Sequence, residues 1–210
     1  MKKITLLFAS LIAFGTANAQ SNVTQTVNVV IPAVTLINIA SNTAQTLNMA
    51  APTLAGANIS DASTPTNTIY IQYSSMMSAT AVATSRSIYV TSSTTEASLA
   101  GIKLTVTASI PTVDPTGVAS NGNIGTTGGT VNILNGGAAL AGIVSTGVPT
   151  STSPKLVQGI TSGFTGTTNT SGASVVYSSS IAGNISAAIY GTIRAKSYAV
   201  AVLYTLADTI

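Results

Sequence analysis

Short runs in which apolar and polar residues alternate recur along this chain, and this period of two is the feature that most restricts its fold. Successive side chains of a β-strand point to opposite faces of a sheet, so such alternation predicts strands with one buried face. The runs are rich in Val, Ile and Thr, which favour strands, and turn residues separate them. We expect an extended piece at 34–37 and strands over residues 68–73, 87–91, 103–108, 174–177, 185–190 and 198–206.

No segment has the 3.6-residue apolar stripe of a long helix. Many short strands joined by turns are typical of sandwiches and barrels. We therefore predict an all-β fold, an antiparallel immunoglobulin-like β-sandwich, with a single domain over residues 20–210. The Gly/Thr/Ser-rich stretch 111–173 is interpreted as a loop-rich elaboration of that domain, and a disordered linker between two domains is the alternative.

The first nineteen residues have the three parts of a secretory signal peptide. Lys2 and Lys3 are the charged start, residues 4–14 are apolar, and Ala17-Asn18-Ala19 supplies the small residues of a cleavage site. The apolar run is shorter than the about 20 residues that span a bilayer. We expect cleavage after Ala19, a mature chain that begins at Gln20 without a transmembrane helix, and export through the periplasm to the cell surface or beyond.

The residue types that carry most enzyme chemistry are missing, since the chain has no His, no Cys and no Trp. Ser-His and Cys-His catalytic arrangements and His or Cys metal sites are therefore excluded. The carboxylates are widely spaced, and two of them occur in loop contexts where Asp commonly bonds to the backbone. They are Asp61, Glu96, Asp114 and Asp208. We predict no enzymatic activity, no metal and no cofactor.

Charge is sparse, with seven cations and four carboxylates in 210 residues. Loss of Lys2 and Lys3 with the signal peptide would leave five scattered cations and lower the net charge from +3 to +1. No polybasic patch remains, so nucleic acid is not expected as a partner. A surface so poor in charge has little electrostatic protection against self-association, which favours a chain that assembles or lies against a surface.

Residues 20–31, just after the expected cleavage site, are a possible donor strand, and the part from Val23 to Ile31 alternates as a strand does. Its two faces carry Val23, Val27, Val29 and Ile31 on one side, and Thr24, Thr26 and Asn28 on the other. A strand with a free end can add to the sheet of another molecule and place alternate side chains in a groove. It can equally be the first strand of its own sandwich, and both interpretations remain open.

A second pattern lies at the C-terminal end, where a glycine precedes a strand-like run of alternating apolar residues. These positions are Gly191, Tyr198, Val200, Val202 and Tyr204. A Gly about a dozen residues before a near-terminal Tyr resembles the last strand of exported pilus subunits of the donor-strand type, including spore coat U-like proteins. The resemblance covers the two ends of the chain. It implies self-association or related subunits as partners and a periplasmic chaperone during export.

Three functions from different classes follow from these patterns. The leading one is an exported structural or adhesive subunit of an extracellular fibre or cell-surface layer that assembles by β-strand addition. The second is a monomeric, secreted ligand-binding sandwich of the carbohydrate-binding kind, for which the absence of Trp gives little support. The third is an outer-membrane β-barrel, whose aromatic girdles the composition does not supply.

Overall fold

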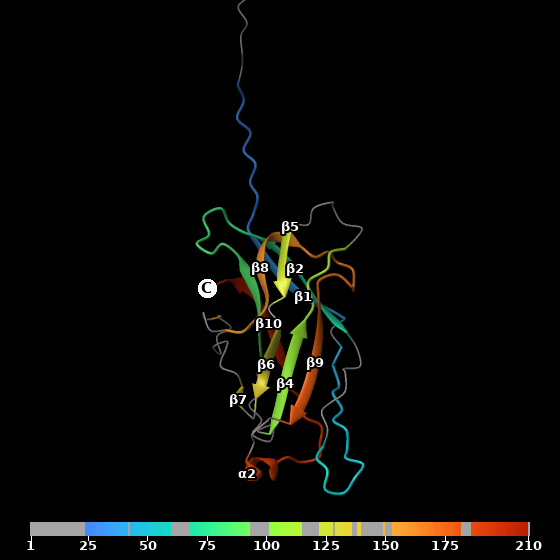
Figure 1. Ribbon diagram of the computed structural model, residues 1–210. Coiled ribbons are helices and arrows are strands. Elements are labelled where there is room, and N and C mark those ends of the chain that lie inside the picture. The colour runs from blue at the N-terminus through green and yellow to red at the C-terminus, as the bar shows by residue number, and fades with distance from the viewer. Residues whose placement is uncertain are drawn as a thin grey trace, which may run out of the picture. The chain divides into compact units, whose positions relative to one another are not determined.

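A computed structural model describes most of the chain downstream of the expected signal peptide (Figure 1). The signal peptide, Gln20, Val23, Asp61 and Glu96 lie outside the described residues. The chain divides into two compact units, Met1–Ile31 and Pro32–Ile210. The described residues are 24–41, 43–59, 68–92, 101–114, 122–127, 129–135, 138–139, 149, 153–181 and 186–209.

Within these ranges the second unit consists of ten strands and one short helix (Figure 1). Every pair of neighbouring strands is antiparallel. The predicted all-β, antiparallel class is therefore confirmed. The elements are β1 (Val34–Ala40), β2 (Ile69–Met76), β3 (Arg86–Ser92), β4 (Ile102–Ala108), β5 (Gly122–Thr127), β6 (Thr130–Asn135), β7 (Ala138–Ala139), β8 (Lys155–Phe164), β9 (Ala173–Ile181), α2 (Ala187–Tyr190) and β10 (Val202–Asp208).

The strands form one sheet that folds over itself into two layers of a sandwich-like structure. The β2 layer has the order β1-β2-β9-β4-β6-β7, and the β3 layer has the order β5-β8-β3-β10. The two layers are joined where the end of β2 pairs with the end of β8, at Ser74 with Phe164 and Ser75 with Gly163. Figure 1 shows β6, β4 and β9 of the β2 layer side by side.

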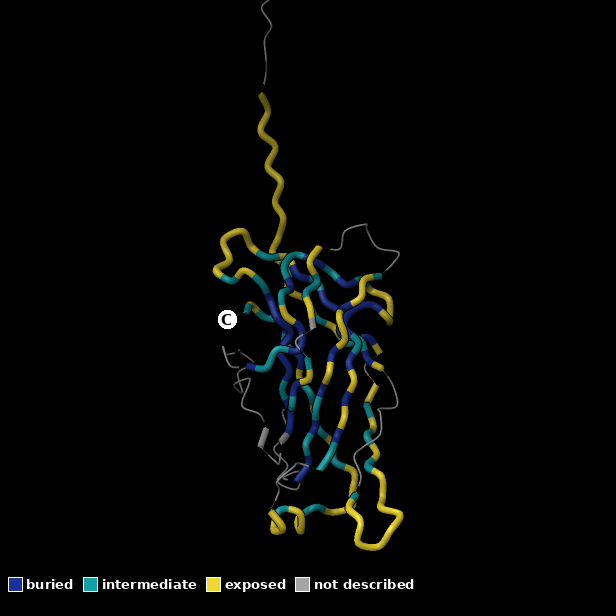
Figure 2. Tube along the Cα trace, in the orientation of Figure 1, coloured by how far each residue is buried: buried dark blue, intermediate teal, exposed yellow. Residues whose placement is uncertain are grey.

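The core lies between the inner faces of the two layers. Buried residues alternate with more exposed ones along β4 and β9, as the period of two in the sequence requires (Figure 2). Each fully buried aliphatic side chain contributes about 1.5–3 kcal/mol to folding, so this single core can stabilise a domain that has no disulfide. Its best-buried aliphatic members include Ile71, Ile88, Val106, Leu156, Ile160 and Val175.

One predicted strand is wrong, because residues 187–190 form the single-turn helix α2 instead. The hydroxyl oxygen of Ser186 accepts a hydrogen bond from the Ile189 amide at 3.3 Å and caps the first turn. Gly191 ends the helix and donates its backbone N–H to the Ala187 carbonyl at 2.9 Å. These local bonds override the weak strand preference of the alternating sequence.

The middle stretch 111–173 is elaborated with strands as well as loops, since it contains β5, β6, β7 and β8. Two of these strands place buried residues in the core, for example Ile133 on β6 and Ile160 on β8. Its glycines include positions that no other residue could fill without a clash. A Cβ atom on Gly172 would lie 2.0 Å from the Ile71 carbonyl oxygen, where β9 begins beside β2.

Within the first unit, the described residues 24–31 form no strand, and every one of them is exposed. We call residues 24–31 the N-terminal segment. Its apolar residues are largely accessible to solvent, with Val27 75%, Val29 81% and Ile31 71% exposed. A single copy of the chain therefore leaves the apolar face of this segment unburied.

Candidate functional site: an apolar groove beside strand β10

Strand β10 has one paired and one open edge. It pairs with β3 along its whole length, from Val202 opposite Ser92 to Asp208 opposite Arg86. It stands at the end of the strand order, and no strand in the described part of the chain pairs with its other edge. An open edge of this kind presents unpaired N–H and C=O groups that can hydrogen-bond to another strand.

A groove of about 900 Å³ lies next to this open edge. The β3 layer ends at β10, so part of the inner face of the β2 layer is left without a strand across from it. That uncovered inner face forms an apolar floor. The floor residues on β2, β4, β6 and β9 are Ile69, Ile102, Leu104, Leu134, Tyr177, Ser179 and Ile181.

Two extended stretches of chain, residues 45–49 and 198–202, line the sides of the groove. Residues 45–49 and 198–201 are not part of a strand, yet both stretches alternate in burial as strands do. The half-buried positions pack against the core, and the residues between them are exposed. The half-buried apolar positions are Leu47, Met49, Tyr198, Val200 and Val202.

The structure brings four of the five predicted C-terminal residues together, because Tyr198, Val200, Val202 and Tyr204 all line the groove. The strand begins at Val202, later than the predicted start at residue 198. Gly191 is outside both strand and groove, since it caps α2, and a Cβ atom there would lie 3.3 Å from the Ala187 carbonyl oxygen.

Tyr198 is held by contacts within its own loop. Its hydroxyl donates to the Arg194 carbonyl oxygen at 2.8 Å and accepts from the Arg194 amide at 3.3 Å. The Lys196 ammonium lies 4.7 Å from the centre of the Tyr198 ring, a cation–π contact. These bonds fix the chain in an extended wall of the groove before β10 begins.

A pair of tyrosine hydroxyls lies at the end of the groove nearest the middle of β10. The Tyr177 and Tyr204 oxygens are 2.5 Å apart, and both residues are only 8% exposed. Burial raises the pKa of each hydroxyl above its usual value, although for Tyr177 the hydrogen bond to Tyr204 opposes this rise. We call these two groups the hydroxyl pair. Sequence reasoning did not single out Tyr177; only its inward position in the alternation of β9 could have indicated it.

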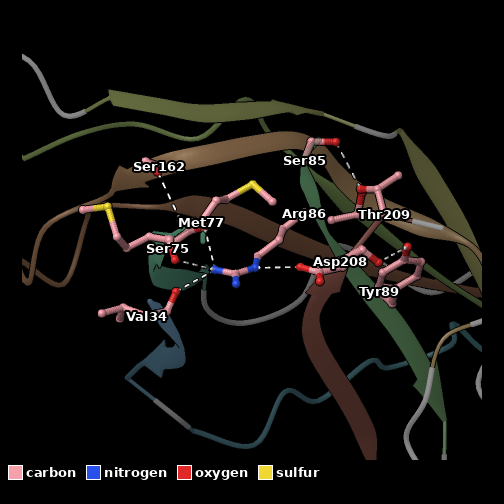
Figure 3. Close-up of polar contacts among 11 residues, drawn as sticks. Val34, Ser75, Met77, Ser85, Arg86, Tyr89, Ser162, Asp208 and Thr209 are labelled. Carbon is pink, nitrogen blue, oxygen red and sulfur yellow. Dashed lines mark hydrogen bonds and ion pairs between the residues drawn. The ribbon is translucent and has the colours of Figure 1, made fainter. Parts of the chain in front are cut away.

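Beyond the hydroxyl pair, a buried arginine joins β10 to the other edge of the sandwich (Figure 3). Arg86 on β3 donates from Nε to Asp208 Oδ1 at 3.0 Å and from Nη1 to the Val34 carbonyl oxygen at 2.6 Å. The same Nη1 lies 3.1 Å from Ser75 Oγ and 3.5 Å from the Met76 carbonyl oxygen. This Arg86 clamp connects β1, β2, β3 and β10.

The two described acidic residues have structural contacts. Asp208 forms the ion pair with Arg86. Asp114 donates its backbone N–H to the Thr165 carbonyl oxygen at 3.0 Å. In the described ranges no three His, Cys, Asp or Glu side chains gather as a metal site would require, and none of the described helical residues form a span long and apolar enough to cross a membrane.

The chain matches no protein-family model, no curated protein and no solved structure. The function of the groove must therefore be argued from its own geometry. That geometry is an open strand edge beside an apolar floor, with extended walls and a polar hydroxyl pair at the Tyr204 end.

Proposed function

We propose that this chain is an exported structural subunit of an extracellular fibre or surface layer, and that copies join by strand addition. The N-terminal segment of one copy lies in the groove of the next and pairs with the open edge of β10. One observation carries this proposal. The same chain has an exposed segment with an alternating apolar face and an apolar groove beside an unpaired strand edge.

The two surfaces match in length and periodicity. The N-terminal segment has eight described residues, which span about 25 Å when extended at about 3.3 Å per residue. The β10 side of the groove runs from Tyr198 to Tyr204 with an inward side chain at every second residue. A strand that drops every second side chain into such a groove meets apolar positions at the same spacing.

Burial of the segment supplies the driving force. Val27, Val29 and Ile31 are mostly exposed in the single chain, and each would contribute about 1.5–3 kcal/mol when fully buried. Fixing the segment costs conformational entropy, which offsets part of this gain. Hydrogen bonds along β10 add to the free energy gained by burial. Because the chain carries few charges, electrostatic repulsion between copies is weak.

The proposal predicts that two aspartates on the apolar face of the segment abolish assembly. The variant is Val27→Asp with Val29→Asp in the full mature chain, and its matched control is Thr26→Asp with Asn28→Asp, which adds the same charge to the opposite face. Native protein and control should form polymers in light scattering and negative-stain microscopy. The double valine variant should remain monomeric with an unchanged circular dichroism spectrum, because those valines are exposed in the single chain.

Two results would overturn the proposal. If the double valine variant polymerises like the native chain, the segment is not the joint. If it loses its β spectrum as a monomer, the segment belongs to its own sandwich, and the groove needs another occupant.

A further inference from the structure

One polar residue interrupts the apolar face of the N-terminal segment. Gln25 lies on the same side as Val27, Val29 and Ile31, and it is exposed in the single chain. A carboxamide carried into an apolar groove costs free energy unless it finds hydrogen-bond partners there. Most of the groove floor is aliphatic and offers none.

The hydroxyl pair is a polar point at one end of this groove, and Ser179, one inward position further along β9, is the other polar residue of the floor. Tyr177 and Tyr204 both line the groove, and their hydroxyls bond to each other. That bond uses one of the two hydroxyl hydrogens, so one hydrogen and several lone pairs remain, and they have no further partner among the described residues. A carboxamide, which both donates and accepts, complements such a pair.

The order of residues along the two surfaces supports the match. From the end at the hydroxyl pair, the β10 side presents Tyr204, then Val202, Val200 and Tyr198. An antiparallel segment with Gln25 opposite Tyr204 places its three apolar residues opposite the other three positions. Parallel pairing from the same point would instead carry them past Tyr204, where the groove lining ends, toward the Arg86 clamp.

We propose that Gln25 of one copy hydrogen-bonds to the hydroxyl pair of the next and thereby sets the register of the joint; this inference rests on the proposed function. A slip of two residues keeps the same face inward but moves the carboxamide to the level of Val202 or Leu206. In either position the carboxamide would lose its contact with the hydroxyl pair. A single buried polar residue fixes register in the same way in coiled coils.

Cysteine crosslinking reads the register directly, because the chain has no cysteine of its own. The acceptor copy, which supplies the groove, carries Val27→Asp and Val29→Asp. The donor copy, which supplies the N-terminal segment, carries Val200→Asp in its own groove, so that only one joint forms. Thr26→Cys on the donor should crosslink to Leu203→Cys on the acceptor at least about tenfold faster than to Thr205→Cys. All three positions lie on outward faces of the proposed ladder.

The register preference should depend on both partners. Gln25→Val in the donor should bring the two crosslinking rates to within about twofold of each other, and so should Tyr177→Phe with Tyr204→Phe in the acceptor. Circular dichroism and thermal unfolding check that each variant is folded. A preference that survives both changes overturns the register role of Gln25. If native donor and acceptor form no complex at all, the proposed function itself fails.

Discussion

At the residue scale, buried tyrosine side chains supply both apolar surface and hydrogen bonds in the core. Tyr73 donates to the Ile124 carbonyl oxygen at 2.5 Å, and Tyr177 and Tyr204 bond to each other. Each ring adds apolar area to a core without Trp, and each hydroxyl has a partner. Burial raises the pKa of all three hydroxyls above their ordinary value of 10.

These raised pKa values predict a loss of stability in alkaline solution. The unfolded chain ionises its tyrosines near the ordinary pKa of 10, while the folded chain keeps these protons to higher pH. Above about pH 10 the free energy of unfolding should therefore fall, by up to about 1.4 kcal/mol per pH unit for each such tyrosine. Urea unfolding of the monomeric Val27→Asp, Val29→Asp variant from pH 8 to 11.5 measures this fall.

The control is the same variant with Tyr177→Phe and Tyr204→Phe, which retains the lysines and the other tyrosines. Its free energy of unfolding should decline less steeply above pH 10. Equal slopes in the two proteins would show that the hydroxyl pair is not protected from ionisation.

At the element scale, period-two alternation was sufficient to predict β2, β3, β4 and β9, because each of these strands places alternate apolar side chains in the core, although β3 is buried on both faces. It failed at residues 187–190, where the Ser186 cap stabilises a helical turn. It also could not predict which strand ends the sheet. The groove depends on the pairing of β10 with β3 alone, a contact between residues far apart in sequence that no local pattern encodes.

The N-terminal segment also shows what alternation alone cannot predict. It alternates over most of its length, with Gln25 and Val30 as exceptions, yet residues 24–31 form no strand in the single chain. Alternation reports a face that can be buried, but it does not tell whether the partner is the same molecule or another. Arg86 is a further example, since its four contacts come from β1, β2 and β10 and leave no motif in the sequence.

The Arg86 clamp should stabilise the packing of these strands. Arg86→Ala leaves several buried acceptors without a donor, so we expect the free energy of unfolding to fall by about 2 kcal/mol. Asp208→Asn should cost less than about 1 kcal/mol, because the carboxylate is 53% exposed and can be hydrated. Denaturant unfolding of the monomeric variant measures both. Equal effects of the two substitutions would mean that only the ion pair matters.

At the scale of the whole molecule, the chain has two complementary unsatisfied surfaces. The groove has an open edge and an apolar floor, and the N-terminal segment has an exposed apolar face. Joining them head to tail gives a heterologous contact, which repeats without closing unless the rotation between copies forms a ring. Under the proposed function, an open contact of this kind would give fibres from identical copies. The sparse charge and the absence of disulfides are compatible with a chain stabilised in this way by its neighbours.

The most direct test of strand addition is a mixture of two variants that are each unable to polymerise. One has Val27→Asp with Val29→Asp and retains its groove, and the other has Val200→Asp and retains its N-terminal segment. Each alone should be a folded monomer in light scattering, and the mixture should give one complex of two chains and nothing larger. A mixture that stays monomeric, or a Val200→Asp protein that still polymerises by itself, would contradict strand addition between the segment and the groove.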